Sequence, residues 1–119
     1  MASLSSGCYP LAVRVLVLET NLMWSVKLSK ALSALGHEPK VAAQPIEGEF
    51  DLAIVNLGEP GVDWSARVAE LHARGMRVIA HAGHKEKELH ELGRQAGCDT
   101  LATNSELTHK LADVLARAG

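Results

Sequence analysis

Five short apolar runs, separated by segments with helical periodicity, constrain the fold of this chain most. The runs are rich in Val, Ile and Leu and lack polar alternation, which is typical of strands buried on both faces of a parallel sheet. Strands that alternate with helices predict right-handed crossovers, so we expect a doubly wound α/β sheet. The runs are residues 11–19, 37–43, 51–57, 76–82 and 99–103.

The segments between the runs predict four amphipathic helices. Each is followed by a glycine, and three are preceded by small polar residues that commonly cap helix N-termini. We expect Thr20 or Asn21 to cap the first helix and Asn104 or Ser105 to cap the last. The predicted core-facing stripes are Leu22, Val26, Leu32 and Leu35; Trp64, Val68 and Leu71; Leu89, Leu92 and Ala96; and Leu107, Leu111 and Leu115.

One crossover is unusually short. Only residues 44–50, QPIEGEF, separate the second run from the third. Parallel neighbours need about a dozen or more connecting residues, so these two strands should lie on opposite sides of the first. We therefore predict a five-stranded parallel sheet of order 2-1-3-4-5, with the second crossover helix shortened or missing. Residues 11–119 should form one domain, preceded by a flexible tail over residues 1–10.

Composition narrows the classes of partner and compartment. The chain has 119 residues and a net charge of −2, and its aromatic residues are Tyr9, Trp24, Phe50 and Trp64. A near-neutral chain with so few aromatic residues argues against nucleic-acid binding. No apolar run approaches the length of a membrane span, and the N-terminus lacks the features of a signal peptide. Two cysteines without a CxxC pairing suit a reduced, cytoplasmic protein.

The motif DLAIVNLGEPGVDW, residues 51–64, resembles the third strand and following loop of response-regulator receiver domains. The stretch at 14–21 is similar to the first strand of that family, 77–84 to its fourth strand, and 96–105 to the turn that leads into its fifth. The four motifs occur in the family's order and span nearly the whole domain. The resemblance implies a receiver fold and a role in signalling.

The same resemblance implies that the phosphorylation chemistry has been lost. The phospho-acceptor position falls on Asn56, whose amide cannot form the acyl phosphate that a carboxylate forms. The acidic pair that would hold Mg²⁺ falls on Glu19 and Thr20, the hydroxyl position on His81, and the lysine position on Asn104. We expect a stand-alone pseudo-receiver without cofactor or enzymatic activity.

A pseudo-receiver would act through protein contacts, with a partner protein or as a homodimer. In the receiver family, the fourth helix, the fifth strand and the fifth helix commonly form such a surface. The matching apolar residues are Leu89, Leu101 and Leu107, and Leu101 takes the place of the family's aromatic switch residue. These three leucines are the candidate interaction surface.

A second hypothesis is a small-ligand or metal-binding module at the carboxyl edge of the sheet. Ligands of open α/β sheets bind at that edge, and imidazole suits Zn, Ni or Cu. A metal would be held by His81, His84 and Glu19. The competing interpretation is that His81 hydrogen-bonds locally and His84 opens the following helix.

Overall fold

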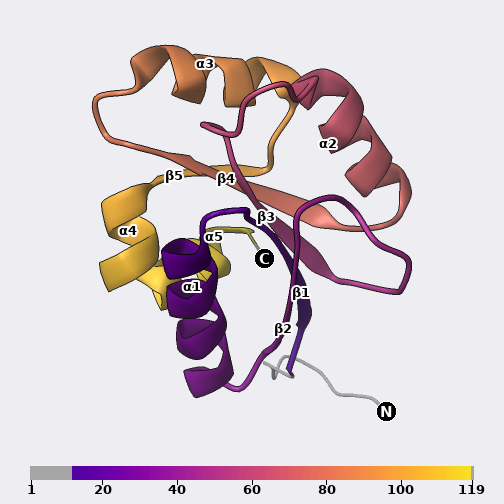
Figure 1. Cartoon of the computed structure of the whole chain (residues 1–119), viewed down its shortest axis with the longest axis vertical. Helices are drawn as coiled ribbons and strands as arrows, with labels where there is room; N and C mark the ends of the chain where they lie inside the picture. The colour runs from indigo at the N-terminus through magenta and orange to yellow at the C-terminus, as the bar shows by residue number, and fades with distance from the viewer. Residues whose placement is uncertain (1–11, 119) are drawn as a thin grey trace.

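The computed structural model describes residues 12–118, which form a five-stranded parallel sheet of order β2-β1-β3-β4-β5 (Figure 1). The predicted fold class and strand order are confirmed. The expected tail over residues 1–10 lies outside the described residues. The strands are β1 (Arg14–Leu18), β2 (Glu38–Ala42), β3 (Leu52–Asn56), β4 (Arg77–Ala82) and β5 (Thr100–Thr103). The helices are α1 (Leu22–Ala34), α2 (Trp64–Ala73), α3 (Lys87–Ala96), α4 (Asn104–His109) and α5 (Leu111–Ala118).

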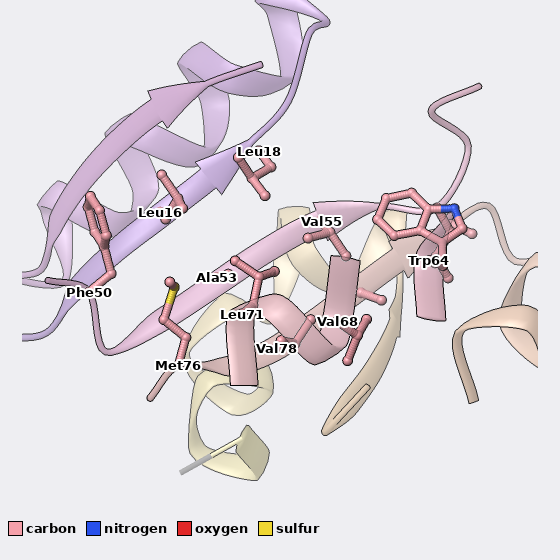
Figure 2. Packing of buried hydrophobic residues seen from close by; sticks show 13 residues of the cluster. Leu16, Leu18, Phe50, Ala53, Val55, Trp64, Val68, Leu71, Met76 and Val78 are labelled. Carbon is pink, nitrogen blue, oxygen red and sulfur yellow. The ribbon is translucent and has the colours of Figure 1, made fainter. Parts of the chain in front are cut away.

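The helices form a layer on each face of the sheet, with α2 and α3 on one side and α1, α4 and α5 on the other (Figure 1). Strand alternation sorts the side chains between the two layers. Leu16 and Leu18 join the α2 side, shown in Figure 2, whereas Val15 and Val17 join the α1 side. Among residues 12–118, no helix has the length and apolar character needed to span a bilayer.

The connection between β2 and β3 contains no helix, as the sequence predicts. Phe50 belongs to the hydrophobic cluster on the α2 side, and Ile46 packs against that cluster. Arg74, at the C-terminal end of α2, donates hydrogen bonds to the carbonyl oxygens of Ile46 (2.6 Å) and Gly48 (3.1 Å). This guanidinium therefore anchors the link that replaces the crossover helix.

The predicted core stripe of α1 is largely wrong. The buried residues are Ser25, Leu28 and Leu32, while Leu22 is 80% exposed and Val26 is 50% exposed. Leu35, the C-cap residue, is also exposed. The buried face includes Leu28, and on a helical wheel of 100° per residue Leu22 lies about 120° from Leu28 and Val26 about 160° from it, outside an apolar stripe of about 100°.

The last predicted helix is two helices, because the backbone of Lys110 leaves the helical region at φ −136° and ψ 38°. The N-cap of α4 is Thr103, and neither Asn104 nor Ser105 takes that role. Thr103 and Glu106 form a capping box, in which each side chain accepts a hydrogen bond from the other residue's backbone N–H. Such a box satisfies two donors at once, which explains the choice of cap.

The predicted stripe of α3 also needs one correction. Leu92 is exposed, and the helix is brought close to the sheet through Gly93. A Cβ atom added at Gly93 would lie 2.8 Å from side-chain atoms of both Leu57 and Leu101. The close approach that only glycine permits therefore turns Leu92 away from the core.

Candidate functional site

The carboxyl ends of β1, β3 and β4 bring three of the predicted site residues together. Glu19 directly follows β1, Asn56 ends β3, and His81 on β4 stands in register with Asn56. Adjacent parallel strands end at one edge of the sheet, which is why residues far apart in the sequence meet here. Glu19 and His81 are both buried, so the site has a charged group in its interior.

Glu19 is the centre of a hydrogen-bond network. Asn56 Nδ2 lies 3.2 Å from each carboxylate oxygen, and the backbone N–H of Asn21 donates to Oε2 at 3.1 Å. His81 Nε2 lies 3.5 Å from Oε1. Burial by itself raises the pKa of the Glu19 carboxyl, but hydrogen bonds from His81, Asn21 and Asn56 outweigh burial and lower the pKa below its usual value. The carboxyl is therefore held in its ionised form.

Asn56 uses both ends of its amide within the protein. Its Nδ2 faces the Glu19 carboxylate, and its Oδ1 accepts a hydrogen bond of 2.9 Å from the backbone N–H of Gly58. The first contact requires a donor, which an aspartate at this position would not supply at neutral pH. The residue is therefore matched to its neighbours as an amide.

His81 is fixed on several sides. Nδ1 lies 2.7 Å from Asn104 Oδ1, at the start of α4, and Nε2 faces the Glu19 carboxylate. The Trp24 ring lies against the imidazole, with ring centroids 5.5 Å apart and an angle of 44° between the planes. The imidazole thus links β1, β4, α1 and α4, in keeping with the interpretation that His81 bonds locally.

Thr20, the fifth predicted site residue, points away from this network. Its side chain is exposed, and its hydroxyl donates a 2.6 Å hydrogen bond to Glu59 Oε1. This contact joins the loop after β1 to the loop after β3 across the outside of the site. Glu59 and Trp24 were not among the predicted site residues, because a contact between two loops and a contact between two rings leave no pattern in the spacing of residues.

The metal hypothesis gains no ligand set from the structure. Within the described part of the chain, no three or more His, Cys, Asp or Glu side chains form a group able to hold a metal ion. Glu19 and His81 are neighbours, but His84 is exposed in the turn before α3. The buried side chains of Glu19 and His81 already contact each other, so the structure does not support a metal site formed by Glu19, His81 and His84.

The candidate interaction surface also changes. Leu107 is fully buried on the α1 side of the sheet, so the prediction that it belongs to the interaction surface is wrong. The helix α4 lies against α1, β4 and β5, so its apolar side chain at position 107 packs inward into the cluster on that face. Leu89 and Leu101 are half-buried and pack against the cluster on the α2 side. The three leucines therefore do not share one exposed face.

Comparisons with known proteins identify the fold. The chain matches no family model, and no curated protein is similar in sequence. Solved structures match closely in shape. The chemotaxis response regulator CheY4 of Vibrio cholerae has a TM-score of 0.76 at 16% identity, with 92% of this chain and 100% of that chain covered.

Two further matches have the same architecture. The receiver domain of the sensor histidine kinase PA1611 from Pseudomonas aeruginosa, solved with magnesium in its active-site cleft, gives 0.75 at 19% identity, covering 91% of this chain and 98% of that one. The orphan response regulator HP1043 of H. pylori gives 0.69 at 20% identity, covering 90% and 97%. The chain has the CheY-like receiver fold, and identities this low establish the fold alone.

Proposed function

We propose that this protein is a pseudo-receiver that is not phosphorylated at Asn56 and acts through protein–protein contacts in a signalling pathway. The observation that carries the proposal is the Asn56 amide, whose nitrogen donates to Glu19 and whose oxygen accepts from Gly58. The receiver fold supports the signalling part, and the side chains at the carboxyl edge support the loss of phosphorylation.

The residues at this edge do not fit Mg²⁺. That ion prefers hard oxygen ligands and retains several waters in an octahedral shell. Here the Glu19 carboxylate faces an amide nitrogen of Asn56 and an imidazole nitrogen of His81. Thr20, in the position of a second carboxylate, hydrogen-bonds to Glu59 outside the network. The negative charge of Glu19, which a cation would balance, is already stabilised by hydrogen-bond donors of Asn21, Asn56 and His81.

The internal contacts also assign a structural task to the site. Glu19 accepts from the backbone at the start of α1, and His81 contacts both Trp24 of α1 and Asn104 of α4. Together these contacts hold α1 and α4 against the ends of β1 and β4. In this proposal the protein keeps one conformation without a phosphoryl group and presents its surface to a partner continuously. It needs no cofactor and performs no catalysis.

A titration followed by amide NMR tests the proposal. Mg²⁺ with beryllofluoride mimics a phosphorylated receiver aspartate, and a phosphorylatable receiver treated in parallel is the positive control. We expect no saturable shifts at the amides of Glu19, Asn56 and His81. A stoichiometric adduct with new resonances at these three residues would overturn the proposal.

A further inference from the structure

The first two turns of α1 expose large apolar side chains. Leu22 is 80% exposed, Met23 is 74% exposed and Val26 is 50% exposed. Leu22 and Val26 are four positions apart, and Met23 lies beside them, so the three share one outward face of the helix. Such clusters on a soluble protein often mark a binding surface, whereas single exposed apolar residues are ordinary.

The fold itself does not use these residues. The inward face of α1 buries Ser25, although a valine is adjacent in the sequence. Ser25 satisfies its hydroxyl by donating to the carbonyl oxygen of Leu22 at 3.0 Å. A helix that buries a serine and exposes Leu22, Met23 and Val26 breaks the usual pattern, and such breaks concentrate at functional positions.

The charged side chains of α1 itself are of one sign. Lys27 and Lys30 are exposed, and they lie four positions after Met23 and Val26, on the same outward face. No Asp or Glu occurs in Leu22–Ala34. Glu59 lies near the start of the helix, but its carboxylate accepts the hydroxyl of Thr20. The surface therefore combines an apolar centre with a basic side.

We propose that Leu22, Met23, Val26, Lys27 and Lys30, hereafter the α1 surface, dock a partner protein that presents apolar side chains flanked by carboxylates. This inference deepens the proposed function and rests on its assignment of protein contacts. Charge complementarity identifies the partner's chemistry, since apposed opposite charges favour the correct partner and like charges exclude others.

The same charges disfavour two other occupants. A second copy of the chain docked α1 against α1 would place lysines against lysines, with no acid on either helix to compensate. An anionic membrane is attracted by clusters of about four to eight basic residues, whereas this surface has two lysines on a chain of net charge −2. An amphipathic acidic helix needs only an apolar anchor and a few opposite charges.

The α1 surface adjoins the buried network through Trp24. This residue lies in the first turn of α1, next to Met23, and its ring contacts His81. Asn21 caps the same turn by accepting from the Trp24 N–H, and the Asn21 N–H donates to Glu19. A partner bound to the first turn would therefore alter the surroundings of Trp24, which provides a fluorescence signal.

The test uses synthetic amphipathic helical peptides as probes, followed by amide NMR of the full chain and by Trp fluorescence. One peptide has leucines along one face flanked by glutamates, and a second has lysines in place of the glutamates. We expect the acidic peptide to shift the amides of α1 and to bind at least about tenfold more tightly than the basic one.

Paired variants locate the binding. Met23→Ser and the double variant Lys27→Glu/Lys30→Glu should each weaken binding about tenfold or more, and neither removes a buried group. The control Lys85→Glu/Lys87→Glu makes the same change of net charge at exposed positions just before α3 and at its first residue, and it should change affinity less than about twofold.

Four results would overturn this inference. They are equal binding of the two peptides, shifts that map away from α1, binding to anionic vesicles that the α1 variants abolish, and self-association by sedimentation that Met23→Ser abolishes. A beryllofluoride adduct together with retained binding of the acidic peptide would reject the proposed function and keep the α1 surface. If neither an adduct nor peptide binding is observed, the α1 surface is rejected and the proposed function is kept.

Discussion

Replacing Asn56 with aspartate would restore a carboxylate at the acceptor position and test why an amide stands there. The change keeps the acceptor for the Gly58 N–H but removes the donor that lies 3.2 Å from both oxygens of Glu19. A hydrogen bond to a charged group contributes about 1.5–3 kcal/mol. Two carboxylates about 4 Å apart repel by about 4 kcal/mol at an effective dielectric constant of 20.

Sharing a proton between the two carboxyls relieves part of that repulsion, so we expect Asn56→Asp to cost about 3–5 kcal/mol at pH 7. As the pH falls toward 5, one carboxyl binds a proton and again donates to the other. The loss relative to the wild type should therefore shrink with falling pH. Urea unfolding followed by Trp fluorescence at both pH values measures this difference.

Asn104→Asp is the matched control, because it makes the same substitution in the same cluster. Asn104 Oδ1 faces His81 Nδ1 at 2.7 Å, so a carboxylate there would keep the contact. The residue also begins α4, where negative charge is favourable. We expect this variant to lose less than about 1 kcal/mol. The reasoning is refuted if Asn56→Asp costs no more than Asn104→Asp, or if its cost grows as the pH falls.

Three other substitutions probe the fold and the network. Glu19→Gln should destabilise the protein by about 3–5 kcal/mol at pH 7. The folded Glu19 pKa lies below the ordinary value of 4.5, so its contribution is present above that pH and is lost below it. The variant's acid-unfolding curve should be flatter, and an unchanged slope below pH 4.5 would contradict this. Gly93→Ala should cost about 1–3 kcal/mol in thermal or urea unfolding, because the new methyl group would lie 2.8 Å from Leu57 and Leu101. Arg74→Ala should speed amide hydrogen exchange in residues 44–50 about tenfold or more, since both hydrogen bonds to the carbonyl oxygens of the link disappear. Unchanged exchange rates would show that the conformation of this link does not depend on Arg74.

The sheet could be predicted from the sequence because burial on both faces leaves continuous apolar runs, such as residues 51–57 and 76–82. The strand order followed from the short link over 44–50, which cannot make an ordinary crossover. The positions of Glu19, Asn56 and His81 followed in turn, since the ends of neighbouring parallel strands meet at one edge.

Other features depend on tertiary contacts that leave no pattern in the spacing of residues along the sequence. Ser25 is less apolar than Val26, so hydrophobicity alone selects the wrong face of α1. The outward turn of Leu92 depends on how closely Gly93 approaches the sheet. The hydrogen bond between Thr20 and Glu59 joins two loops whose conformations local sequence does not specify. These departures arise where tertiary packing outweighs local pattern.

The central claim is that the Asn56–Glu19–His81 network takes the place of a phosphorylation site. Intact-mass spectrometry after incubation with acetyl phosphate and Mg²⁺ tests this most directly, with a phosphorylatable receiver as the control. The account predicts an unchanged mass for this chain under conditions that fully modify the control. A stoichiometric phosphoryl adduct that maps to the carboxyl edge of the sheet would contradict it.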